Sequence, residues 1–151
     1  VPMQSIQRVR KTDLARSTRQ VINNVLRGQT AVVESHGQPE VAIMDIVDYR
    51  ITRAVMRYHA QQPEIDVEEG LADQQVTSTS DPQERFNLIL AHYLAGAISL
   101  GRAAELLELP WVDLRTRFQR LDVPLRVAPS DLQEARLDVE VAEAWAETPS
   151  K

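Results

Sequence analysis

Basic side chains gather near the N-terminus, and their chemistry suits contact with a polyanion. Residues 8–19 contain a single acid, Asp13, and five cations, which are Arg8, Arg10, Lys11, Arg16 and Arg19. Cations beside the first turns of a helix can bind phosphate groups together with the helix's free N–H groups. From charge alone a solvated basic face is the other interpretation, because runs of Lys and Arg commonly face water.

A second set of polar side chains lies in residues 111–121. Leu114, Phe118 and Leu121 repeat at helical spacing, so the opposite face would present side chains that can bind bases or phosphates: Asp113, Arg115, Thr116, Gln119 and Arg120, with Arg117 beside them. The preceding run 98–107, with its small Ala103 and Ala104, and the break at Leu109-Pro110 are typical of a helix-turn-helix. A helical bundle used only for packing or dimerisation remains an alternative, because nearby acids offset the arginines.

Catalytic and metal-binding patterns are missing from the sequence. The three histidines, His36, His59 and His92, have no second ligand at metal-binding spacing, and there is no glycine-rich phosphate loop or nucleophile motif. The acids at 64, 66, 68 and 69 could serve a metal-dependent nuclease, but they lie in a polar stretch without positional support. We therefore expect no enzyme, no metal and no cofactor, with the nuclease kept as a minor hypothesis.

Charge is distributed unevenly along the chain. The 151 residues carry a net charge of −5, yet residues 1–60 hold nine Lys or Arg against five Asp or Glu. Residues 1–60 would therefore bind a polyanion, while the acidic remainder of the chain is solvated or binds a basic partner. The chain has no cysteine, no apolar run of about 20 residues and no apolar signal-peptide core after its N-terminus, so we expect a cytoplasmic protein that does not enter a membrane.

Hydrophobic periodicity predicts an α+β fold in four segments. Residues 3–60 should form strand, helix, strand, strand and helix, with a helix end at Gly28, a hairpin loop over 35–39 and a helix cap at Asp48. Residues 61–84 are expected to be a linker with at most one helical turn. A helix-turn-helix domain at 85–126 and an acidic amphipathic helix within 127–151 complete the prediction.

Four features of the first segment together resemble the Phd/YefM family of antitoxins. They are the opening Met3-Gln4-Ser5-Ile6, the run Asn23-Asn24-Val25, Gly28, and the hairpin end Val41-Ala42-Ile43-Met44. The resemblance covers about residues 3–58 and implies a homodimer whose strand-to-helix corner and hairpin tip contact operator DNA. Lys11 stands where the family usually has arginine, so the resemblance does not imply a forked contact to guanine at this position. His36 at the hairpin tip likewise replaces a residue that is often basic.

The run Ile98-Ser99-Leu100-Gly101-Arg102-Ala103-Ala104-Glu105-Leu106 resembles a prokaryotic helix-turn-helix family that often accompanies PIN-type ribonuclease toxins. Taken together, the two resemblances predict an antitoxin that binds double-stranded operator DNA as a dimer, represses its own operon and neutralises a toxin, possibly a PIN-type ribonuclease. A transcriptional or architectural DNA-binding protein without a toxin is the alternative. The apolar stripe of the last helix is expected to bind the toxin or to dock on the chain itself: Leu132, Leu137, Val141 and Trp145.

Overall fold

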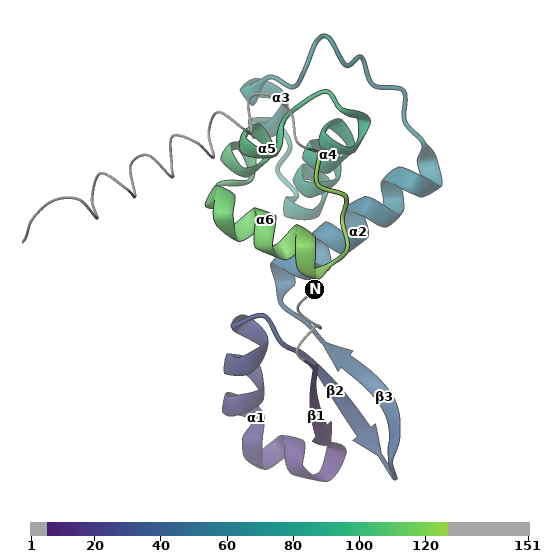
Figure 1. The fold of residues 1–151 in the computed structure, drawn as a ribbon, viewed down its shortest axis with the longest axis vertical. Helices are drawn as coiled ribbons and strands as arrows, with labels where there is room; N and C mark the ends of the chain where they lie inside the picture. The colour runs from purple at the N-terminus through teal and green to yellow at the C-terminus, as the bar shows by residue number, and fades with distance from the viewer. Residues whose placement is uncertain (1–5, 127–151) are drawn as a thin grey trace, which may run out of the picture. The chain divides into compact units, whose positions relative to one another are not determined.

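The computed structural model describes residues 6–126 and divides the chain into two compact units. The boundary falls after Thr52, inside helix α2 (Ile46–Gln61). The described residues form a mixed α+β protein with a three-stranded sheet and six helices (Figure 1). This confirms the α+β class, and no helix within the described range is long and apolar enough to cross a membrane.

The first unit begins with a strand, a helix and a second strand that runs parallel to the first. Strand β1 (Ile6–Arg10) leads directly into α1 (Lys11–Leu26), and β2 (Thr30–Ser35) then pairs with β1 in parallel. Strand β3 (Gln38–Ile43) pairs antiparallel with β2, giving the sheet order β1-β2-β3. The predicted order of elements over this part of the chain is therefore confirmed.

Helix α1 covers one face of this sheet because its apolar positions recur every three to four residues. Val21 and Val25 pack with Val9 and Ala31 in a small buried core, and Leu14 and Ile43 lie against it. The amide of Asn24 donates to Oε1 of Gln7 at 2.8 Å, which ties α1 to β1. As expected, Gly28 supplies the left-handed residue that terminates the helix: α1 ends at Leu26, and Gly28, two residues later, has a positive φ of 104°, which favours glycine.

The hairpin loop is shorter than the sequence predicts. Residues 35–39 were expected to form it, whereas only His36 and Gly37 do, and Ser35 and Pro39 belong to the strands. Both loop residues have positive φ, 51° and 75°, as the tight turn that matches strand twist requires. Pro39 is tolerated because β3 is an edge strand, where a missing N–H need not break a ladder bond.

The predicted cap of α2 is also wrong, because the capping residue lies three positions before Asp48. The carboxylate of Asp45, and not that of Asp48, accepts hydrogen bonds from the backbone N–H groups of Val47 at 2.8 Å and Asp48 at 3.2 Å. Helix α2 consequently begins at Ile46. A capping side chain must precede the first free N–H groups, and Asp45 stands at that position.

The second unit is helical and packs around its own core. It contains α3 (Asp73–Thr77), α4 (Pro82–Ala95), α5 (Leu100–Leu107) and α6 (Trp111–Arg120). A hydroxyl cap from Ser99 starts α5, and a three-residue turn beginning at Glu108, with φ of 57°, leads to α6. The side chains of Tyr93, Leu114 and Phe118 are completely buried between these helices.

The segment expected to be a linker contributes to this unit. Residues 61–84 include α3 and the first turn of α4, and the side chains of Leu71 and Val76 are buried. Arg102 on α5 donates to the backbone carbonyl of Leu71 and pairs with Asp73 and Glu105. The hydrogen bond that Arg102 donates to the Asp73 carboxylate is the main reason why the pKa of Arg102 is raised, and the charged guanidinium holds α3 against α5.

The hydroxyl of Tyr93 anchors residues 124–126 to α4, and removing it should lower stability. The hydroxyl donates to the carbonyl of Pro124 at 2.8 Å and accepts from the backbone N–H of Arg126 at 2.9 Å. We expect Tyr93→Phe to lower the free energy of unfolding by about 1–3 kcal/mol, because the two backbone groups lose a buried partner. Urea unfolding followed by far-UV circular dichroism measures this, and an unchanged midpoint would contradict the anchoring role.

Candidate nucleic-acid interfaces

The predicted strand-to-helix corner and the hairpin turn lie at the same end of the sheet. In the parallel register Arg10, the last residue of β1, pairs with Glu34 near the end of β2, and the turn begins two residues later at His36. The Nζ atom of Lys11 lies 3.6 Å from a carboxylate oxygen of Glu40, close to the start of β3. The structure therefore places Arg8, Arg10, Lys11 and His36 toward the same end of the sheet.

Each cation of this corner has a carboxylate partner. Arg8 lies 4.0 Å from Glu34, Arg10 lies 3.1 Å from Asp13, and Lys11 faces Glu40. The arginine side chains are still 79% and 81% exposed, so water screens these pairs strongly. The corner can reach a ligand, but three nearby carboxylates reduce its net positive charge.

Helix α1 carries a second group of cations on the face turned away from the sheet. Arg16, Arg19 and Arg27 are exposed, and no carboxylate in residues 6–126 comes within ion-pair distance of any of them. Residues 14–33 contain no acid at all. Two of these arginines, Arg16 and Arg19, were predicted from the sequence, whereas Arg27 was not.

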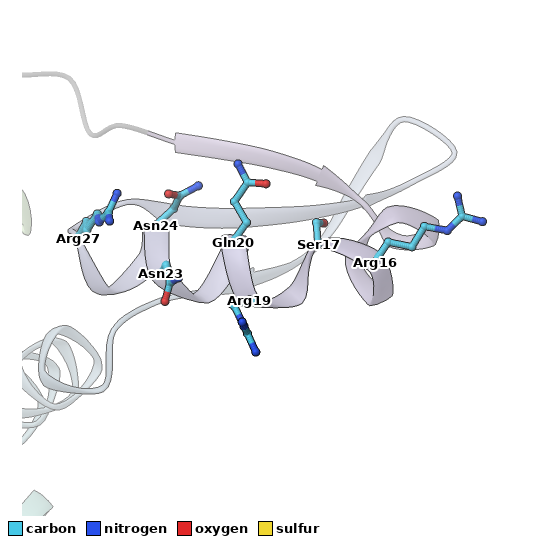
Figure 2. A pocket seen from close by; sticks show the side chains of 7 residues that line it. All are labelled: Arg16, Ser17, Arg19, Gln20, Asn23, Asn24 and Arg27. Carbon is cyan, nitrogen blue, oxygen red and sulfur yellow. The ribbon is translucent and has the colours of Figure 1, made fainter.

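These arginines share a shallow hollow with amide side chains, which we call the α1 outer face. Its lining residues are Arg16, Ser17, Arg19, Gln20, Asn23, Asn24 and Arg27. Figure 2 shows Gln20, Asn24 and Arg27 extending to one side of the helix axis, Arg19 and Asn23 to the other, and Arg16 at the far end. Spacing of three, four and seven residues places Gln20, Asn23 and Arg27 on one helical face, which is the sequence signal that could have identified Arg27.

A kink in α1 lies within this hollow. Ser17 has non-helical backbone angles, φ −115° and ψ 17°. The hydroxyls of Ser17 and Thr18 donate to the carbonyls of Asp13 at 2.8 Å and Leu14 at 2.6 Å, a pattern that bends helices. The bend separates the first turn, which belongs to the corner, from the turns that bear Arg19 to Arg27.

Helix α6 presents a smaller set of candidate contacts. Arg115, Thr116 and Gln119 are exposed as predicted, while Arg120 is half-buried and already engaged in an interaction within the chain. Asp113 and Arg117 neutralise each other at 3.0 Å. The guanidinium of Arg115 lies 5.5 Å from the centre of the Trp111 ring, which stacks it at the start of the helix. Arg115 is thus the main accessible cation of this face.

The acidic segment forms no metal-binding group in the described part of the chain. Glu64, Asp66 and Glu69 line a surface hollow together with His92, whose Nδ1 lies 2.8 Å from the carbonyl oxygen of Leu88. No cluster of three or more histidine or carboxylate side chains between residues 6 and 126 could hold a metal ion. The predicted toxin-binding residues Leu132, Leu137, Val141 and Trp145 lie outside the described residues.

The first unit exposes most of the large apolar side chains that are exposed in the described residues. Of the nine large hydrophobic residues that are exposed between residues 6 and 126, six belong to the first unit: Ile6, Ile22, Leu26, Val41, Ile46 and Tyr49. Ile22 and Leu26 are one turn apart on α1, beside the outer face. Neighbouring exposed apolar side chains such as this pair favour association with another protein surface.

Comparison of the chain with protein-family models, with curated proteins and with solved structures finds no match.

Proposed function

We propose that this protein is a dimeric DNA-binding protein of the antitoxin kind, which represses transcription from its own promoter and neutralises a toxin. The single observation that supports DNA binding most strongly is the surface charge of the first unit. Between residues 6 and 52, six cations are exposed, whereas only two of the five acids, Asp13 and Glu40, are. Asp45 and Asp48 are buried. A cationic surface on an acidic protein is suited to the DNA backbone.

The size and surface of the first unit support dimerisation. About 50 residues bury too little apolar area to be very stable alone, and the unit leaves six large apolar side chains exposed. A second copy would bury them and would also place two cationic surfaces on one duplex. The Phd/YefM resemblance supports the same arrangement.

DNA binding can be tested with a labelled duplex from the region upstream of the gene. We expect fluorescence anisotropy to show binding that weakens steeply as salt rises, and an unrelated duplex of equal length to bind less tightly. Binding to neither duplex at low salt would contradict the proposal. Equal affinity for both would favour an architectural DNA-binding protein over a repressor.

The toxin partner is proposed from the two family resemblances. Co-expression with the product of the neighbouring gene should yield a complex that purifies together, and this chain should restore growth to cells that express that product alone. If no complex forms and growth is not restored, the alternative of a DNA-binding protein without a toxin is favoured. The same test on residues 1–126 would show whether the acidic C-terminal segment is the part that binds the toxin.

A further inference from the structure

The two groups of cations in the first unit differ in how much positive charge they can offer a ligand. At the corner, Arg8, Arg10 and Lys11 are each paired with a carboxylate, so phosphate binding there must compete with Glu34, Asp13 and Glu40. The arginines of the α1 outer face have no such competitor. Because each phosphate contact draws on uncompensated positive charge, the outer face has the stronger electrostatic attraction for DNA.

The side chains between the arginines suit the same ligand. Gln20 and Asn23 are exposed on this face, and their amide N–H groups can donate to phosphate oxygens. Asn24, by contrast, donates to Gln7 and serves the fold. Arg19 and Arg27, which both follow the kink at Ser17, are separated by eight residues, a helix length of roughly 12 Å at 1.5 Å per residue, which is enough to meet several phosphates of one strand.

We propose that the α1 outer face is the main phosphate-binding surface of the first unit, with Arg16, Arg19 and Arg27 as its charged contacts and Gln20 and Asn23 as hydrogen-bond donors. This inference rests on the proposed DNA-binding function and assigns the dominant backbone contact to α1, with the corner in a lesser role. Contacts to phosphates carry no sequence information. The face therefore supplies affinity for any duplex, and discrimination between sequences comes from other residues.

The test compares the salt dependence of DNA binding between full-length variants. Arg16→Ala/Arg19→Ala/Arg27→Ala should lower the slope of log affinity against log salt by about 0.9 for each lost contact, so by about 2.7 in total. The related and unrelated duplexes should lose affinity by the same factor, on the order of tenfold or more at low salt. The three residues are exposed, so the thermal midpoint should not move.

Three matched variants separate this inference from general effects of charge. Arg53→Ala removes one exposed cation of α2 and should change the slope less than Arg27→Ala, which removes one from the outer face. Arg10→Ala/Lys11→Ala should change the slope less than Arg16→Ala/Arg27→Ala, although both remove two charges. Replacing Arg16, Arg19 and Arg27 by lysine should preserve most of the slope, because counterion release depends on charge.

The possible outcomes distinguish the two proposals. If the unmodified protein binds no duplex, the DNA-binding function itself fails. If it binds DNA and the triple alanine variant keeps the original slope, or if only its preference between duplexes changes, the assignment of the outer face is wrong while DNA binding stands. If the triple alanine variant keeps its DNA binding but loses binding to polyglutamate, the outer face binds an acidic protein instead, and the inference is overturned.

Discussion

Replacing Ile22 and Leu26 together by glutamine is expected to convert the proposed dimer to a monomer. Both side chains are exposed in the isolated chain, Leu26 at 62%, and they lie one turn apart on α1. Burying such a side chain in an interface contributes about 1.5–3 kcal/mol, so the double change should weaken dimerisation by at least about 100-fold. Sedimentation equilibrium measures the dissociation constant directly.

The loss of DNA affinity in the same variant should be equally large. A monomer presents one cationic surface where the dimer presents two, so affinity for the upstream duplex should fall steeply while the net charge of each chain is unchanged. Val67→Gln is the matched control, because Val67 is 53% exposed but belongs to the second unit. A variant that remains dimeric would exclude this flank of α1 from the interface, and an unmodified protein that is monomeric at all concentrations would contradict the homodimer.

Truncating Phe118 to alanine is expected to have the largest effect on stability. The ring is fully buried, and its centre lies 5.3 Å from that of Tyr93 on α4. Removing a buried aromatic ring costs about 3–5 kcal/mol, which is comparable to the entire stability of a small domain. Hydrogen exchange should show loss of protection in the amides of α4, α5 and α6.

The same variant distinguishes the two candidate DNA-binding surfaces. When the second unit is unfolded, α6 no longer presents Arg115, Thr116 and Gln119, whereas the first unit has its own core around Val21 and Val25. We expect most of the affinity for unrelated duplexes to persist, because the exposed cations of the first unit remain. Phe118→Leu, which keeps most of the apolar volume, should lose less stability. Complete loss of DNA binding in the alanine variant would assign the dominant contact to the helical unit.

Local patterns in the chain were sufficient to predict most of the elements. The spacing of Leu14, Val21 and Val25 predicted α1, and the break at Leu109-Pro110 separated α5 from α6, because both signals act within a few residues. The exact boundaries of these elements were harder to predict from the sequence. The hairpin loop and the cap of α2 depend on which of several suitable residues takes the positive φ or accepts the N–H groups, and that choice is made by strand pairing and helix position.

The composition of the chain also determined that its positive charge is concentrated in the first part and that Arg8, Arg10, Lys11, Arg16 and Arg19 are candidates for DNA contact. Only the tertiary structure decided which of these cations have partners. Glu34 and Glu40 are distant from the corner in sequence but are brought to it by the pairing of β2 with β1 and β3. The outer face of α1 meets no such neighbour in the described chain because it points away from the sheet. Charge is a property of residues, but its compensation depends on distance, which the fold alone sets.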